Sequence, residues 1–271
     1  MRFGPHVVFK SIALKNAFRS LMPEAASGPR VSKIAMNKNQ YGQPIGEPMP
    51  EWSPRPMPGR VVLSGDFCRI EPLDPERHAG DLYEAYRTAP DDRDWTYMLA
   101  GPFRDEDEYR RYAGEISSKA DPFHYAVIDT ALGKAVGSFA LMRIEPKHGV
   151  IEVGHVAFSP LLKRKPASTE AQFLLMRYVF DYLKYRRYEW KCDTLNGPSR
   201  NAAQRLGFNF EGIFRQAVVY RGRSRDTAWF SIIDQEWPPL KEAFQTWLSA
   251  GNFDADGKQV RSLAEIRGKE P

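Results

Sequence analysis

The residues best suited to chemistry lie in one segment of the chain, residues 151–171, which reads IEVGHVAFSPLLKRKPASTEA. Its first part is typical of a strand and its last part begins a long amphipathic helix, with the basic loop Lys163-Arg164-Lys165 between them. A helix N-terminus carries free N–H groups and a partial positive charge, so this arrangement could hold a phosphate group. Ser168 and Thr169 are candidates for the N-cap. Alternatively, the loop is a solvated basic turn.

The same segment contains a candidate general base. Alternation along a strand predicts that residues 152, 154, 156 and 158 share one face, and Glu152 is the only titratable group among them. Burial of this carboxylate would raise its pKa toward neutral pH, where a carboxylate is an effective proton acceptor. The alternative is an exposed glutamate at a strand end. His155, predicted to lie on the opposite face, and Asp193 are two further candidate bases.

The elements that would position these residues alternate along the chain from residue 67 onward. Periodicity and breaker residues predict strands at 67–73, 124–129, 135–143, 150–158, 188–194, 214–220 and 227–233. Helices are predicted at 75–87, 105–119, 171–182, 196–207 and 237–250. Asp74 is the expected N-cap of the first helix, and Gly207 the expected end of the fourth. This order predicts a mixed α/β domain over residues 61–237, with a central mixed sheet flanked by helices, followed by a helix and a polar tail over 238–271.

The N-terminal part of the chain has a different composition. The first 50 residues hold seven Lys or Arg and two acidic residues, and the remaining 221 residues hold 32 of each. The net charge of +5 therefore belongs to this part, and the body of the chain has no basic field that would favour a nucleic-acid partner. Residues 1–35 are read as an extension that does not fold with the domain, with an organelle-targeting presequence and a membrane-surface helix as alternatives. Six prolines between residues 43 and 58 predict an extended linker or a strap laid on the domain surface.

The composition of the whole chain excludes several classes of protein. A chain of 271 residues with 42% hydrophobic residues can bury a core, and it has no uninterrupted apolar stretch of about 18 residues that would span a membrane. Cys68 and Cys192 lie far apart, and neither has a histidine at ligand spacing. We therefore expect no zinc site and a reducing compartment, the cytoplasm. Cys192 is interpreted as a strand residue rather than a nucleophile, because no histidine lies near it in sequence.

Two motifs resemble a known family. Residues 190–208, WKCDTLNGPSRNAAQRLGF, contain a strand, an Asn-x-x-Ser helix start at Asn196 and Ser199, and a helix end in Gly-Phe. The loop Lys163-Arg164-Lys165-Pro166-Ala167-Ser168 lies in register with the pattern Gln/Arg-x-x-Gly-x-Gly/Ala, with Lys, Pro and Ser at the three defined positions. Together with the element order over 67–237, these motifs resemble the GNAT superfamily of acyl-CoA-dependent N-acyltransferases, in particular its RimJ/RimL-like branch.

The resemblance implies a function and a set of site residues. It implies an acetyl-CoA-dependent N-acetyltransferase, in which a primary amine of a protein N-terminus or a small molecule attacks the acetyl group directly. In such an enzyme Glu152 would be the base, and Ser199 would donate a hydrogen bond to the departing thiolate. The implied acetyl-CoA-binding residues are Val156, Ala157, Phe158, Lys163, Arg164, Lys165, Ala167, Ser168, Thr169 and Asn196, the first three through backbone amides.

Other properties follow from the same resemblance or stay open. The family needs no metal, and we expect a monomer or homodimer with no nucleic-acid or membrane partner. An acyl-CoA-binding module that keeps the fold without catalysis is the alternative, because Pro166 removes one backbone donor from the loop. Asp94, Trp95, Tyr97 and Asp226 are candidates to hold a cationic acceptor amine, with ordinary turn and capping roles as the alternative.

Overall fold

The computed structural model describes residues 37–268 in two compact units, which divide between Trp52 and Ser53. In the first unit, strands β1 (Asn37–Lys38) and β2 (Pro44–Ile45) pair as a small antiparallel hairpin. The Asn39 side chain closes its turn by accepting hydrogen bonds from the N–H groups of Tyr41 and Gln43. The expectations for residues 1–35 fall outside the described residues.

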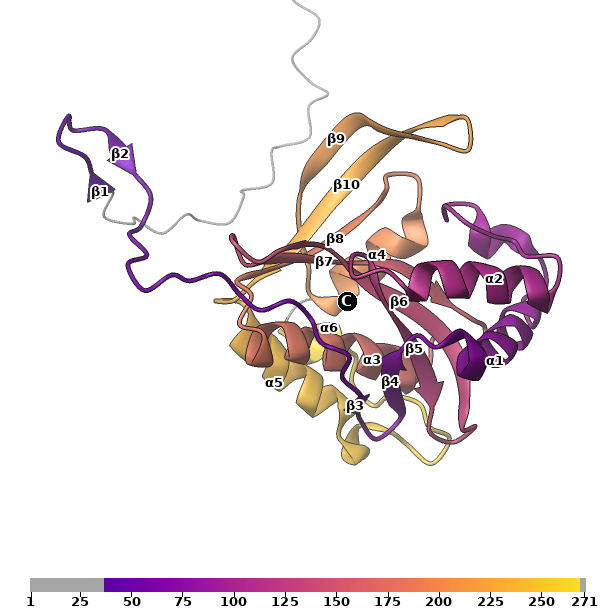
Figure 1. Cartoon of the computed structure of the whole chain (residues 1–271). Coiled ribbons are helices and arrows are strands. Elements are labelled where there is room, and N and C mark those ends of the chain that lie inside the picture. Colours follow the sequence, from indigo (N-terminus) through magenta and orange to yellow (C-terminus); the bar gives the residue numbers. More distant parts are fainter. Residues whose placement is uncertain (1–36, 269–271) are drawn as a thin grey trace, which may run out of the picture. The chain divides into compact units, whose positions relative to one another are not determined.

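The second unit is built on one eight-stranded sheet (Figure 1). Its strands follow the order β3-β4-β5-β6-β7-β8-β10-β9, and each neighbouring pair is antiparallel except β7 and β8, which are parallel. β9 and β10 begin earlier than the predicted strands. The strands are β3 (Leu63–Ser64), β4 (Cys68–Pro72), β5 (Phe123–Asp129), β6 (Lys134–Glu145), β7 (Val150–Phe158), β8 (Arg187–Asp193), β9 (Asn209–Tyr220) and β10 (Arg223–Ile233).

Helices cover both faces of this sheet. They are α1 (Pro75–Arg87), α2 (Glu106–Ser117), α3 (Pro166–Arg177), α4 (Gly197–Leu206), α5 (Trp237–Leu248) and α6 (Leu263–Ile266), with short turns η1 (Asp92–Trp95), η2 (Tyr178–Tyr182) and η3 (Ala250–Asn252). Apolar side chains of α1 and α2 pack over β5 and β6, and those of α3 and α5 form the larger core on the opposite face. The mixed α/β class and the flanked mixed sheet predicted from the sequence are confirmed. Over residues 37–268, no helix has both the length and the apolar character needed to cross a membrane.

Local sequence explains where several helices begin and end. The Asp74 carboxylate caps α1 by accepting from the N–H of Glu76 at 3.0 Å, and Pro75 takes the first helical position, as predicted. Gly207 ends α4 with a φ of 105°, a left-handed conformation that glycine adopts without a steric penalty.

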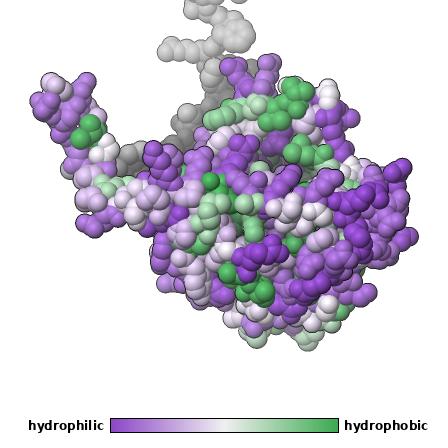
Figure 2. Space-filling model, viewed as in Figure 1, coloured by the Kyte–Doolittle hydropathy of each residue, from purple (hydrophilic) through white to green (hydrophobic). Residues whose placement is uncertain are grey.

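Hydrophilic side chains cover most of the face in Figure 2, as expected of helices that bury one apolar stripe.

Two segments outside the regular elements also lie against the second unit. Residues 53–60 form an extended strap, in which the Gly59 N–H donates to the Tyr178 hydroxyl at 2.8 Å and the Pro56 carbonyl accepts from the Tyr185 hydroxyl at 3.1 Å. Within the polar tail predicted for residues 251–271, the described part up to residue 268 is mostly exposed, but Asn252 and Leu263 are buried and Leu263–Ile266 forms α6. The composition does not predict this packing, because only a few side chains of the segment are apolar.

Glu170 joins α3 to the edge of the sheet. Its carboxylate is buried and accepts three backbone hydrogen bonds, from the N–H groups of Asp66, Phe67 and Cys68 at 2.8, 2.7 and 2.7 Å. A side chain at Gly65 would collide with this carboxylate, since a Cβ there would lie 2.3 Å from Glu170 Cδ. The turn between β3 and β4 is therefore shaped around Glu170.

We expect Glu170→Gln to lower the free energy of unfolding by about 1.5–3 kcal/mol, because the amide cannot accept three hydrogen bonds with the strength of a carboxylate. Urea unfolding followed by circular dichroism measures this loss. The exposed Glu242 on α5 provides the control, and Glu242→Gln should change stability by less than about 0.5 kcal/mol. Equal stabilities of the two variants would contradict the role of Glu170.

Candidate active site

A cavity of 1790 Å³ opens where β7, the start of α3, the start of α4 and the β9–β10 hairpin meet. It is lined by all the catalytic and cofactor-binding residues expected from the sequence except Ala167. Ala167 is 4% exposed and packs in the core beneath the first turn of α3. Segments far apart in the sequence therefore meet at one site.

A β-bulge in β7 shapes the wall of this cavity. Ser138 of β6 lies opposite Ala157 and Ala140 lies opposite Gly154, so two β7 residues, His155 and Val156, face a single residue of β6. His155 has a φ of +49°, which is strained for a residue other than glycine. Such a bulge adds twist and redirects the side chains that follow it.

Because of this bulge, two predictions about the faces of β7 are wrong. Pairing across β6 places Glu152 and Gly154 on the α1–α2 side of the sheet, whereas Val156 and Phe158 pack against the core on the α3 side. The four alternating positions therefore do not share one face. His155 is turned to the side of Glu152, where its Nδ1 lies 3.1 Å from Nε2 of His124, and is not on the opposite face. Side chains of a regular strand point alternately to its two faces, and the extra residue of the bulge reverses this order for the residues that follow it.

The pairing of β7 with β8 ends early. The two strands are in register only from Val150 opposite Arg187 to Val153 opposite Trp190. Beyond Val153, β7 continues beside β6 to Phe158, while β8 continues beside β10 to Asp193. The last five residues of β7 thus have no partner strand on their β8 side, and they line the cavity there.

The basic loop after β7 is tightly wound. The N–H groups of Leu162 and Lys163 both donate to the Ser159 carbonyl, at 3.0 and 2.9 Å, and Arg164 has a φ of +61°. Lys163 Nζ lies 2.5 Å from Asp94 Oδ2, so this cation is paired, while Arg164 and Lys165 are exposed.

The start of α3 differs from the prediction. Lys165 is the N-cap residue and no side chain caps the helix, so Ser168 and Thr169 are not the N-cap. The Ser168 hydroxyl donates to the Lys165 carbonyl at 2.7 Å, and the Thr169 hydroxyl accepts from Arg205 at 3.0 Å. Pro166 is the first helical residue, a position that tolerates a missing N–H.

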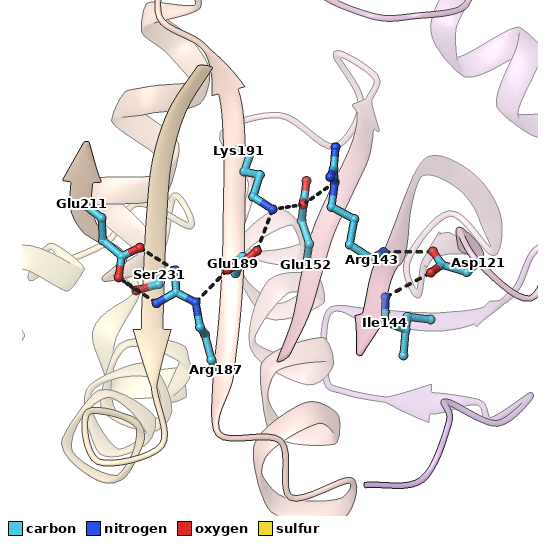
Figure 3. Close-up of polar contacts among 9 residues, drawn as sticks. All are labelled: Asp121, Arg143, Ile144, Glu152, Arg187, Glu189, Lys191, Glu211 and Ser231. Atoms are coloured by element: carbon cyan, nitrogen blue, oxygen red, sulfur yellow. Dashed lines mark hydrogen bonds and ion pairs between the residues drawn. The ribbon is translucent and has the colours of Figure 1, made fainter. Parts of the chain in front are cut away.

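Glu152 lies in a network of buried charges (Figure 3). It is 4% exposed, and its Oε2 lies 2.8 Å from Lys191 Nζ and 3.1 Å from Arg143 Nε. Lys191 also contacts Glu189 at 2.7 Å, and Arg187 extends the network from Glu189 toward β9. Burial raises the pKa of the Glu152 carboxyl above its ordinary value, and the neighbouring cations Lys191 and Arg143 oppose this rise.

The two other candidate bases have different surroundings. Burial lowers the pKa of His155, with a further contribution from the nearby Lys119 ammonium, so its imidazole is neutral at neutral pH. Burial and the neighbouring His155 lower the pKa of His124 to about 4. Asp193 is engaged, since its carboxylate accepts from the Tyr220 hydroxyl and the Leu195 N–H, both at 2.9 Å. Glu152 and His155 therefore remain the two groups that could receive a proton.

Asn196 and Ser199 are arranged as the helix-start motif predicts. The Asn196 side chain accepts from the Ser199 N–H at 3.1 Å and caps α4. The Ser199 hydroxyl oxygen accepts from the indole N–H of Trp190 at 3.0 Å, which leaves its own proton for donation into the cavity. Burial raises the pKa of the nearby Cys192 thiol, which therefore stays protonated and is a poor nucleophile.

The far side of the cavity is walled by the segment between α1 and α2 and by the β9–β10 hairpin. Tyr97 donates from its hydroxyl to the Leu195 carbonyl at 3.0 Å, and the Arg221 guanidinium donates to the Gly101 carbonyl. Asp94 is paired with Lys163, and Asp226 accepts from the Gln216 N–H at 2.7 Å in a β-bulge. Of these two carboxylates, Asp94 lines the cavity and Asp226 does not.

Several site residues were missed by sequence reasoning. Lys191, Arg143 and His124 surround the candidate bases, and Arg205 reaches the start of α3. The charged alternation Arg187, Glu189, Lys191 and Asp193 on β8 could have revealed the charged face of that strand. His124 and Arg205 carry no such signal, because their places depend on strand order and helix packing. Within residues 37–268, no three His, Cys, Asp or Glu side chains gather as a metal site.

The twisted mixed sheet, the early separation of β7 from β8 and the cavity at that separation are features of an N-acyltransferase. The chain matches the family model described as "Acetyltransferase (GNAT) domain" over residues 68–209. It belongs to this GNAT family, and it is an acetyltransferase. The superfamily resemblance found in the sequence is confirmed.

Known proteins agree with this assignment. The structure of a GCN5-related N-acetyltransferase from Brucella melitensis has a TM-score of 0.80 and 49% identity, and the match covers 81% of this chain and 100% of the other. That of a probable GNAT acetyltransferase from Chromobacterium violaceum has a TM-score of 0.67 and 37% identity, covering 72% and 97%. The uncharacterized N-acetyltransferase p20 from Bacillus licheniformis is 26% identical over 148 residues, 52% of this chain and 80% of that protein.

The charge network generates a prediction about stability. We expect Lys191→Met to lower the free energy of unfolding by about 3–5 kcal/mol at pH 7.5, because it leaves Glu152 and Glu189 buried without their shared cation. The loss should shrink as the pH is lowered toward 5. Glu152 has a pKa raised by burial, so in the variant it takes up a proton more readily when folded than when unfolded.

Urea unfolding of wild type and variant at pH 5, 6 and 7.5 measures this dependence. Arg143→Met is the matched control, because its side chain is 58% exposed and its ion pair is screened by water, so its loss should be much smaller. A Lys191→Met deficit that is the same at all three pH values would contradict the electrostatic explanation.

Proposed function

We propose that the protein transfers the acetyl group of acetyl-CoA to a primary amine by direct attack, in the manner of the RimJ/RimL-like branch. The observation that carries this proposal is the unpaired end of β7, which lies in the cavity between the cationic start of α3 and the buried Glu152. One end of the site suits an anionic cofactor, and the other end offers a proton acceptor.

The residues around the cavity fit acetyl-CoA. The uncapped start of α3, with Arg164, Lys165, Ser168 and Thr169 beside it, suits the pyrophosphate, because free N–H groups and cations stabilise negative charge there. Lys163 would have to exchange its contact with Asp94 for the ligand, or remain a support of the loop. Asn196 lies at the neighbouring start of α4, where the pantetheine would pass on its way to Ser199.

The proposed chemistry forms one carbon–nitrogen bond and breaks one carbon–sulfur bond. Backbone N–H groups of Val156, Ala157 and Phe158 that point away from β6 would donate to the acetyl oxygen, and would stabilise the negative charge that develops on it. Glu152 would take the proton that the amine must lose, and Ser199 would donate a hydrogen bond to the departing thiolate. Lys191 and Arg143 keep the Glu152 carboxylate ionised and ready to accept a proton, and burial brings its pKa toward the working range.

The acceptor is proposed to be a peptide N-terminus or a small amine, with the protein acting as a monomer or homodimer. Both cysteines are free and buried, which suits a reducing compartment such as the cytoplasm. Release of the CoA thiol in a screen of peptide and small-amine acceptors tests the function. Specific thiol release with at least one amine supports the proposal, and acetyl-CoA binding without release by any amine would overturn it.

We expect the double variant Arg164→Ala/Lys165→Ala to bind acetyl-CoA at least tenfold more weakly, because each charge-assisted contact to phosphate contributes roughly 1.5–3 kcal/mol. Isothermal titration at moderate salt measures this change. Arg111→Ala/Lys134→Ala removes two exposed cations outside the cavity and should leave the affinity unchanged. Equal affinities of both double variants would mean that the loop is a solvated turn.

We expect Glu152→Gln to keep its affinity for acetyl-CoA and to lose turnover by about 10²–10⁴-fold near neutral pH, because the amide cannot accept the proton. The defect should shrink as pH rises and more of the amine is already neutral. Ser199→Ala should cost less and nearly equally at all pH values. Steady-state rates from pH 6 to 9 with the acceptor found in the screen separate these cases, and wild-type turnover of Glu152→Gln would move the base to His155.

A further inference from the structure

A second group of cations lies where α3, α4 and α5 meet. Arg205, in the last turn of α4, donates from Nη1 to the Thr169 hydroxyl in the first turn of α3 at 3.0 Å. Its guanidinium also lies over the ring of Trp247, 5.2 Å from the centroid. Because Thr169 and Trp247 are 2% and 3% exposed, both contacts are made to fixed groups. The position of the Arg205 guanidinium at the cavity wall is therefore set by the fold.

No protein carboxylate balances the charge of Arg205. Among the described residues, no carboxylate forms an ion pair with it: its hydrogen bond goes to the neutral Thr169 and its guanidinium packs on Trp247, and partial burial lowers its pKa. Arg205 is exposed at the cavity wall, so a ligand can reach a guanidinium that no protein anion neutralises. This corner of the cavity therefore favours an anionic ligand.

The segment after α5 brings a second cation to the same wall. Lys258 lies in a loop that Asp254 closes, since its carboxylate accepts from the Lys258 N–H at 2.8 Å. The neighbouring Gln259 accepts from the indole N–H of Trp247 at 2.9 Å, and Asn252 donates to the Trp247 carbonyl at 2.9 Å. The loop is thus attached to the residue on which Arg205 rests, and Lys258 lines the cavity there.

The acids of the cavity lie elsewhere and have partners. Of the described residues that line it, three are acidic: Asp94 pairs with Lys163, Glu152 with Lys191, and Asp193 with the Tyr220 hydroxyl. Toward Trp247 the lining side chains are neutral or cationic, as in Ser168, Thr169, Arg205, Lys258 and Gln259. Asp254, which accepts from the Lys258 N–H, does not line the cavity, so the side chains that line this corner carry positive charge.

We propose that Arg205 and Lys258 bind the 3′-phosphate of the acetyl-CoA adenosine, so that residues 249–262 form part of the cofactor site. This inference rests on the proposed use of acetyl-CoA. The loop and the first turn of α3 serve the pyrophosphate, and a separate pair of cations beside that turn serves a separate anion. A phosphate monoester carries close to two negative charges at neutral pH, which suits an arginine fork together with a lysine.

Comparison of CoA with dephospho-CoA, which lacks only the 3′-phosphate, tests this inference by isothermal titration on the full chain. We expect the wild type to bind CoA at least tenfold more tightly than dephospho-CoA, a difference of about 1.4 kcal/mol. In Arg205→Met/Lys258→Met the preference should fall below threefold, with the affinity for dephospho-CoA unchanged within twofold. Methionine keeps an apolar stem for packing on Trp247.

The Arg164→Ala/Lys165→Ala variant is the matched control, since it should weaken both ligands equally and keep their ratio. A wild-type ratio near one would overturn the 3′-phosphate site while leaving acetyl-CoA use intact. Equal weakening of both ligands in Arg205→Met/Lys258→Met, at an unchanged melting temperature, would reassign these cations to the pyrophosphate and overturn the inference. Failure of the wild type to bind either ligand would overturn the proposed cofactor and this site together.

Discussion

The site depends on the failure of β7 to stay paired with β8. A parallel pair that continued past Val153 would satisfy the backbone of both strands and close the space between them. The bulge at His155 and Val156 turns β7 away, and β8 instead follows β10. The cavity, the unpaired backbone on its wall and the opposite placement of Glu152 and Phe158 all follow from this separation.

The electrostatics of the site are divided between its two ends. Around the start of α3 the protein supplies cations and helix N–H groups, which favour a negatively charged ligand. On the α1–α2 side of the sheet, Glu152 and Glu189 share the buried Lys191, which lies 3.7 Å from the centroid of the Trp229 ring. Glu152 forms ion pairs with Arg143 of β6 and Lys191 of β8, the two strands that flank β7 (Figure 3), so its position is determined by the sheet rather than by a flexible loop.

Residues near the two ends of the second unit contact and stabilise the helices that position the site. Glu170 fixes α3 to the turn between β3 and β4 through three backbone hydrogen bonds, and α3 in turn sets the place of the basic loop. The strap over residues 53–60 and the folded segment after α5 lie outside the region that matches the family model. The strap contacts Tyr178 and Tyr185 after α3, whereas the segment after α5 packs against α4 and α5 and reaches the cavity through Lys258.

The sequence by itself determined the order of elements, several caps and the segments that form the site. Asp74, Asn196 and Gly207 act locally, through hydrogen bonds and backbone conformations within a few residues, so their roles could be read without a structure. Only the tertiary structure decided the faces of β7, the pairing of Glu152 with Lys191 and Arg143, the contact of His155 with His124, and the folding of residues 249–268. These features arise between strands and helices that are distant in sequence. A bulge leaves no sign in a pattern of alternating residues, and the partners of a buried charge are chosen by strand order and packing.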